Sequence, residues 1–179
     1  MQREESNMQP IKHISHLDLS LCLRFNHASQ YAWVRRLFRT VSRLGDGIFW
    51  YSLMILLLAL YRFEALLPVV HMLLAGGSCT LLYKWLKRKI SRPRPYQVNP
   101  DVECITAPLD RFSFPSGHTL HAVAFSMVVA AYYPLLSWIV FPFTFLVAIS
   151  RMILGLHYPS DVLAGALIGA SIAWVSLQF

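Results

Sequence analysis

Charged residues are scarce in this chain: Lys, Arg, Asp and Glu make up only 14% of its 179 residues. A soluble domain carries roughly 25% of these residues. The hydrophobic share is 56%, and the mean hydropathy is +0.48. The scarcity of charge therefore argues against a soluble globular protein and favours a single integral membrane domain.

Cysteines and acidic residues are also few. The three cysteines, Cys22, Cys79 and Cys104, are far apart and show no metal-ligand spacing. They indicate neither a disulfide framework nor a zinc site. The nine Asp and Glu residues form no carboxylate-rich cluster of the kind that holds Mg²⁺. We therefore expect no metal and no cofactor.

The N-terminal sequence and the net charge narrow the function further. The first ten residues are polar and contain no apolar run, so we expect no cleavable signal peptide. The net charge of +7 suggests acidic partners or an anionic lipid surface. Because the basic residues interleave with apolar stretches, DNA binding is not expected. No pattern in the chain predicts an oligomeric state.

Five apolar stretches predict an all-α fold, a membrane helix bundle of about five transmembrane helices. The stretches are residues 48–61, 65–85, 118–133, 135–152 and 161–177. The first is short for a bilayer, which takes about 20 helical residues. Gly165 and Gly169 form a Gly-x-x-x-Gly pattern, which predicts close packing of the last span against another helix of the same chain.

Residues 1–43 are expected to form a polar tail and an amphipathic interfacial segment, ahead of a membrane-embedded domain at residues 44–179. Seven ionisable residues make a span at 14–43 expensive: Asp18, Arg24, His27, Arg35, Arg36, Arg39 and Arg43. A helix lying in the interface fits better, although leucines at 17–23 also alternate as in a strand. Residues 44–47 predict a turn.

Three short clusters of polar residues lie at the ends of these apolar stretches. They are Lys87 with Arg94-Pro95, the sequence Pro-Ser-Gly-His at 115–118, and Ser150-Arg151 with His157 and Asp161. The first ends span two, the second begins span three, and the third joins spans four and five. Because successive spans alternate in direction, all three clusters fall on one membrane face. This arrangement predicts a cationic pocket with two histidines at a lipid–water boundary, suited to phosphate chemistry on a lipid.

Three cations in the clusters suit a phosphoryl group. Arg94 and Arg151 can donate bidentate hydrogen bonds, and Lys87 supplies a compact charge. Taken alone, Lys87 also fits an interfacial lysine whose stem lies along apolar surface. That interpretation is the one we favour for its basic neighbours: Lys84, Arg88, Lys89 and Arg92.

Residues 115–118 precede a helical stretch. Ser116 can cap that helix, and Gly117 allows close approach of a ligand to the backbone. The free N–H groups of a first helical turn bind anions. A plain helix cap explains these two residues equally well, but it does not explain a titratable His118 at the positive end of a helix dipole.

His157 and Asp161 lie four residues apart with Pro159 between them. We therefore expect His157 in a loop and Asp161 in the first turn of the last span. A carboxylate beside an imidazole fixes its tautomer, which makes the other ring nitrogen a good nucleophile. The alternatives are a helix-capping role for Asp161 and an interfacial polar role for His157.

Taken together, the clusters closely resemble the pattern of the type-2 phosphatidic acid phosphatase family, whose site is shared by vanadium haloperoxidases and soluble acid phosphatases. Every element of that pattern is present, over about residues 44–175. The resemblance implies that His157 attacks phosphorus to form a phosphohistidine, Asp161 orients it, and His118 protonates the leaving oxygen. It also implies a set of phosphate-binding residues: Lys87, Arg94, Ser116, Gly117 and Arg151.

The function expected from these observations is that of a metal-independent lipid phosphatase of the bacterial inner membrane. Undecaprenyl diphosphate is the first substrate to consider, by family analogy. Phosphatidylglycerol phosphate, phosphatidate and lipid A are alternatives, as are phosphotransfer and a non-catalytic lipid binder. Small enzymes of this family usually face their active site away from the cytoplasm, so we expect the site to face the periplasm. By the positive-inside rule, the basic residues at 35–43 would instead place the site in the cytoplasm.

Overall fold

The computed structural model describes residues 16–178, and these residues form helices and no strand. The predicted tail at 1–12 lies outside the described residues. Residues 16–27 are helical, and the remaining helices are α2 (Ala32–Arg43), α3 (Phe49–Tyr61), α4 (Leu66–Lys89), α5 (Pro95–Val98), α6 (Gly117–Tyr132), α7 (Ser137–Ile153) and α8 (Pro159–Ser176). The all-α fold class is confirmed.

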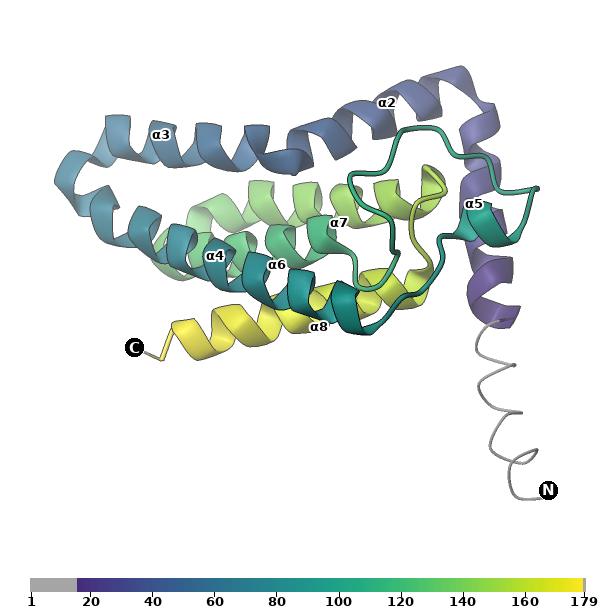
Figure 1. The fold of residues 1–179 in the computed structure, drawn as a ribbon. Coiled ribbons are helices and arrows are strands. Elements are labelled where there is room, and N and C mark those ends of the chain that lie inside the picture. Colours follow the sequence, from purple (N-terminus) through teal and green to yellow (C-terminus); the bar gives the residue numbers. More distant parts are fainter. Residues whose placement is uncertain (1–15, 179) are drawn as a thin grey trace.

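Five long helices, α3, α4, α6, α7 and α8, correspond to the five predicted spans (Figure 1). Three stretches are long and apolar enough to cross a membrane: Ala32–Lys89, Pro134–Ile153 and Pro159–Ser176. The first of these contains both α3 and α4, which reverse direction at the short turn Arg62–Ala65. Helix α6 is shorter, with 16 residues, and packs against α4, α7 and α8. The chain therefore forms a membrane helix bundle of about five helices.

The outer surface of this bundle is apolar as well as its interior. Large side chains such as Ile55, Leu74, Trp138, Leu163 and Trp174 are exposed on α3, α4, α7 and α8. Contiguous apolar surface of this extent is unfavourable in water, so it marks a surface made for a bilayer.

Two glycines allow α8 to pack closely on α6. A side chain on Gly165 would place its Cβ 2.6 Å from the Ser116 carbonyl oxygen, and a Cβ on Gly169 would clash with the carbonyl oxygen of Leu120. The predicted intramolecular role of the Gly-x-x-x-Gly pattern is confirmed. This approach also joins two of the polar clusters, because Ser116 N donates to the Asp161 carbonyl oxygen at 3.0 Å.

The predicted turn at residues 44–47 is not a chain reversal. Helix α2 continues through the wide helical turn Leu44–Ile48 into α3, with a kink where Gly47 adopts φ 122° (Figure 1). The strand alternative for residues 17–23 is wrong, because these residues are helical. Arg35 pairs with Glu103 at 3.4 Å, which ties α2 to the loop before α6. That residues 16–43 lie in the membrane interface stays a prediction.

Candidate active site

The three polar clusters meet at one end of the bundle. The last turns of α4 and α7 and the first turns of α6 and α8 lie together there (Figure 1). A cavity of about 970 Å³ lies at this end, lined by residues of α3, α4, α6, α7 and the loops that connect the helices. Six of the eight predicted site residues line this cavity: Lys87, Arg94, Gly117, His118, Arg151 and His157. The helix topology thus places these residues around one space, as predicted from the alternation of spans.

His157 lies in the loop between α7 and α8, with only 2% of its side chain exposed. The residue lines the cavity, and its Nε2 lies 3.4 Å from Nη1 of Arg94. Its Nδ1 points toward Asp161 Oδ2 at 3.7 Å, which is longer than a hydrogen bond. Burial, and then the positive charges of Arg151, Arg94 and Lys87, hold the pKa of His157 well below its usual value. These effects favour the neutral imidazole.

Asp161 stands in the first turn of α8 and is fully buried. Its Oδ2 accepts the backbone N–H of Tyr158 at 3.0 Å, so the capping alternative also holds. Its Oδ1 accepts a hydrogen bond from Nη1 of Arg92 at 2.7 Å. The interfacial role that we favoured for Arg92 is wrong, because this guanidinium also binds Asp18 Oδ2 at 2.6 Å. Sequence spacing carries no signal for this pairing.

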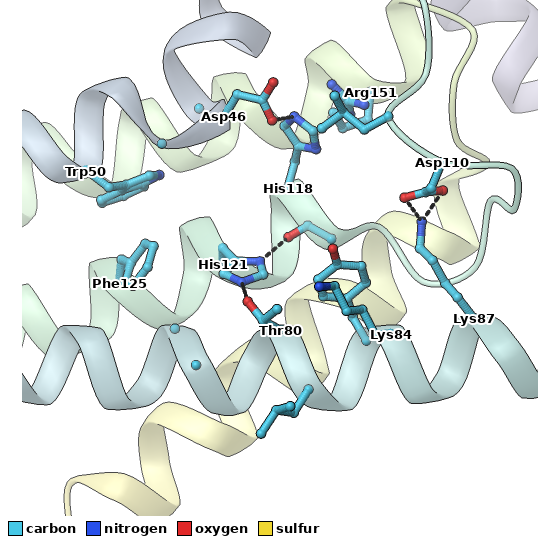
Figure 2. A pocket seen from close by; sticks show the side chains of 18 of the residues that line it. Asp46, Trp50, Thr80, Lys84, Lys87, Asp110, His118, His121, Phe125 and Arg151 are labelled. Atoms are coloured by element: carbon cyan, nitrogen blue, oxygen red, sulfur yellow. Dashed lines mark hydrogen bonds and ion pairs between the residues drawn. The ribbon is translucent and has the colours of Figure 1, made fainter.

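Lys87 and Arg94 both bind a carboxylate that was not predicted to belong to the site. Lys87 Nζ lies 2.6 Å from each carboxylate oxygen of Asp110. Figure 2 marks both contacts with dashed lines. Arg94 Nη2 donates to Asp110 Oδ1 at 2.8 Å. Burial by itself would raise the pKa of the Asp110 carboxyl, but Lys87 and Arg94 together hold it below its usual value. Asp110 is therefore an anion held at the site by two cations.

Arg151 is a buried cation in the last turns of α7, with 3% of the residue exposed. Its Nη1 donates to the hydroxyl of Ser42 on α2. Its Nε has no hydrogen-bond partner among residues 16–178. A buried guanidinium that is only partly paired favours an anion beside it.

His118 lies in the first turn of α6, where its Nε2 is 2.8 Å from Asp46 Oδ1 (Figure 2). Asp46 comes from the α2–α3 junction and was not predicted to take part. Ser116 occupies the N-cap position of α6 without making a side-chain cap bond. Its hydroxyl instead pairs with Thr119 Oγ1 at 2.9 Å, and Ser116 does not line the cavity. Among the described residues, no group of three His, Cys, Asp or Glu side chains is placed to hold a metal ion.

The cavity also has an apolar end, and Thr80 and His121 lie between this end and the cations. Trp50 of α3, Leu73 and Leu81 of α4, and Phe125 of α6 line it. In Figure 2, Trp50 and Phe125 lie at the opposite end from Lys87 and Asp110. The cavity therefore has a cationic end at the helix termini and an apolar end between helices. Such a shape suits an amphiphile with an anionic head.

Several known proteins have sequences similar to this chain. Phosphatidylglycerophosphatase B of Bacillus subtilis is 33% identical over 152 residues, covering 76% of this chain and 70% of that protein. An undecaprenyl-diphosphatase of Sulfolobus acidocaldarius is 29% identical over 152 residues, covering 84% and 72%. The bacitracin transport permease protein BcrC of Bacillus licheniformis is 33% identical over 104 residues, covering 58% of this chain and 51% of that one.

A solved structure agrees with these sequence matches. The crystal structure of Aquifex aeolicus LpxE superposes with a TM-score of 0.80 and 32% identity, covering 91% of this chain and 96% of that one. A sequence model of the PAP2 superfamily matches residues 64–179, which contain all three polar clusters. The PAP2 model matches most of the chain, and the fold agrees with that of Aquifex aeolicus LpxE. This chain therefore belongs to the PAP2 superfamily.

Proposed function

We propose that the protein is a metal-independent lipid phosphatase that removes phosphate from a membrane lipid through a phosphohistidine intermediate. The observation that carries the proposal is the position of His157, which lines a cavity that is cationic at this end and apolar at the other. A neutral imidazole is a nucleophile, and the cations around it attract a phosphoryl group.

In the first step, the Nε2 lone pair of His157 attacks phosphorus, a P–N bond forms, and the P–O bond to the lipid breaks. His118, whose Nε2 lies 2.8 Å from Asp46 Oδ1, donates a proton to the departing oxygen. Asp161 faces Nδ1 and stabilises the positive charge that His157 acquires.

In the second step, water attacks phosphorus while His118 accepts its proton, and the P–N bond breaks. Inorganic phosphate leaves, and His157 returns to the neutral form. Lys87, Arg94 and Arg151, with the Gly117 N–H, would hold the phosphoryl oxygens as negative charge develops on them. Ser116 joins this set only if its hydroxyl turns away from Thr119.

The substrate is proposed from the cavity and the relatives together. The apolar end of the cavity fits an acyl or prenyl chain, and the cationic end fits a phosphate or diphosphate. Undecaprenyl diphosphate is our first choice, supported by the name of the Sulfolobus relative. Phosphatidylglycerol phosphate, phosphatidate and lipid A follow, and a lipid or sugar hydroxyl in place of water would turn the same chemistry into phosphotransfer. We place the enzyme in the bacterial inner membrane with the site facing the periplasm.

The proposal is tested by phosphate release from the purified protein in detergent with EDTA. Undecaprenyl diphosphate, phosphatidylglycerol phosphate, phosphatidate and lipid A would be compared side by side. Wild type would be compared with His157→Ala and with the matched control His27→Ala, a surface histidine on the N-terminal helix. We expect release that survives EDTA, is lost in His157→Ala, and is retained in His27→Ala. Release that is unchanged in His157→Ala would overturn the phosphohistidine mechanism.

The second candidate is a protein that binds anionic lipids without turnover. It is favoured by one observation, the three cations Lys87, Arg94 and Arg151 that line one end of the cavity, since binding needs cations but no nucleophile. The two candidates differ in the His157→Ala variant. An enzyme loses phosphate release in this variant and keeps affinity for lipid, whereas a binder shows no release even from wild type.

A further inference from the structure

Arg92 connects the catalytic pair to the N-terminal helix at residues 16–27. Its Nη1 donates to Asp161 Oδ1 at 2.7 Å, and its Nη2 donates to Asp18 Oδ2 at 2.6 Å. Its guanidinium also lies over the Tyr158 ring, 4.0 Å from the ring centroid. The two carboxylates are 0% and 5% exposed, and Arg92 is 26% exposed. Burying these charges costs free energy of desolvation, so a role in function would explain why the protein keeps them.

We propose that Asp18 and Arg92 are positioning residues for the reaction: Arg92 aims the Asp161 carboxylate at His157, and Asp18 offsets the charge of Arg92. This inference rests on the proposed function of the site. Neither residue would touch the phosphoryl group, because both act through Asp161.

The orienting effect of Arg92 follows from the bonds of Asp161. Arg92 holds Oδ1, and the Tyr158 backbone N–H holds Oδ2 at 3.0 Å. With both oxygens fixed, the carboxylate plane cannot rotate, and Oδ2 stays directed at Nδ1 of His157. Without Arg92, one backbone N–H would remain as the restraint at Oδ2. A small misplacement of a catalytic group can lower the rate about 100-fold.

The effect of Asp18 follows from charge. Without Asp18, Arg92 and Asp161 would form a neutral pair, and a neutral pair attracts a cation only weakly. With Asp18, the three groups carry a net charge of −1, so they still stabilise positive charge on phosphorylated His157. Asp18 is held in place for this role, because its Oδ1 accepts the Ser160 backbone N–H at 2.9 Å.

The N-terminal helix is therefore part of the site's support. Its Cys22 is fully buried and packs in one apolar cluster with Val102 and Tyr158. The Cys22 thiol also donates to the carbonyl oxygen of His157 at 3.8 Å. These contacts dock the helix directly against the loop that carries His157.

The test compares four variants in phosphate release: Asp18→Asn, Arg92→Gln, Arg92→Lys and the double variant Asp18→Asn/Arg92→Gln. We expect each of the first two to lower kcat about 10- to 100-fold with little change in KM. Arg92→Lys should retain more activity than Arg92→Gln. The double variant should be no slower than Arg92→Gln, because without the Arg92 charge Asp18 has nothing to offset.

The charge-compensated double variant separates positioning from simple packing. If the groups only hold the fold together, the kcat losses of the two single variants would add in the double variant, and that result would overturn the proposal. Unchanged kcat in both single variants would overturn it too. Thermal unfolding of each variant in detergent would be measured alongside, and kcat losses that merely follow lost stability also count against it.

Two controls make the result specific. Arg36→Gln removes an exposed arginine of α2 whose side chain makes no hydrogen bond or ion pair to another described residue, and it should behave as wild type. His157→Ala separates the positioning role of Asp18 and Arg92 from the proposed function itself. If release depends on His157 but not on Asp18 or Arg92, the positioning role fails while the proposed function stands. If release does not depend on His157, the proposed function fails first.

Discussion

Lys87 and Asp110 form a close ion pair at the cationic end of the cavity, with Lys87 Nζ 2.6 Å from both carboxylate oxygens. Arg94 shares the same carboxylate. Two of the three cations proposed to hold a phosphoryl group thus bind an anion of the protein itself. A substrate must displace this carboxylate or share the cations with it. The side chain of Asp110 is 36% exposed and lies in a loop, so it has room to move.

Replacing Asp110 by Asn should therefore lower KM for the lipid phosphate. The substitution removes a competing negative charge and keeps the side-chain size. We expect a decrease of about threefold to tenfold, on the order of 1 kcal/mol for a partly exposed ion pair. Steady-state kinetics would measure it, with Asp101→Asn in the same loop as the control. An unchanged or higher KM would mean that Asp110 supports the cations rather than competes with the substrate.

His118→Ala should lower kcat by about 10²–10⁴-fold on a lipid phosphate, because general acid catalysis is worth that much. The loss should be much smaller on a p-nitrophenyl ester, whose leaving group needs no proton. His157→Ala should lose activity on both substrates. Equal losses on both substrates in His118→Ala would contradict its role as the acid.

The buried neutral His157 predicts a loss of stability in acid. Burial and the nearby cations lower its pKa in the folded protein, so the unfolded chain binds more protons below the ordinary value of 6.5. The stabilisation is therefore complete above about pH 6.5 and is lost as the pH falls below it. Thermal unfolding measured from about pH 8 to pH 5 should show a steeper decline for wild type than for His157→Gln. Parallel curves would show that His157 is not the group responsible.

Gly169→Ala should destabilise the bundle, because a Cβ there meets the backbone carbonyl oxygen of Leu120 and α8 must move away from α6. We expect a loss of about 1–3 kcal/mol, as in other overpacked sites. Gly77→Ala is the matched control, since its Cβ meets nothing within 4 Å. In the middle of α4, that alanine should be neutral or stabilising by up to about 1 kcal/mol. Thermal unfolding in detergent compares the two.

Cys104 reports which side of the membrane the site faces. It is exposed in the loop between α5 and α6, whereas Cys22 and Cys79 are buried. With the two buried cysteines replaced, an impermeant thiol reagent should label Cys104 in intact cells if the site faces the periplasm. Labelling only after lysis would place the site in the cytoplasm instead.

Much of the fold could be predicted from local sequence patterns. Long apolar stretches form helices in a bilayer because every backbone polar group must be paired within the segment. Counting these stretches places the ends that carry Lys87, His118 and His157 together, and the structure agrees. The Gly165–Gly169 pattern likewise predicts a close helix contact, because only a missing side chain lets two backbones approach.

Local sequence patterns gave a wrong prediction at residues 44–47. Gly and Asp in this order are typical of a chain reversal, yet the helix only kinks at Gly47. The reason is tertiary: Gly45 packs against Val147 of α7, where a Cβ would lie 2.8 Å from a methyl carbon. Contact with α7 on one side thus keeps α2 and α3 in line, and this line brings Asp46 to His118.

The sequence by itself determined which cations and histidines would share one end of the bundle, since helix length and direction follow from local hydropathy. Only the tertiary structure decided which carboxylate meets which cation. Asp18 binds Arg92 across 74 positions, and Asp110 binds Lys87 across 23. Single carboxylates at such separations leave no periodic or spacing signal. Their pairing is set by helix packing and loop path, which bring the charges within a few ångströms of one another.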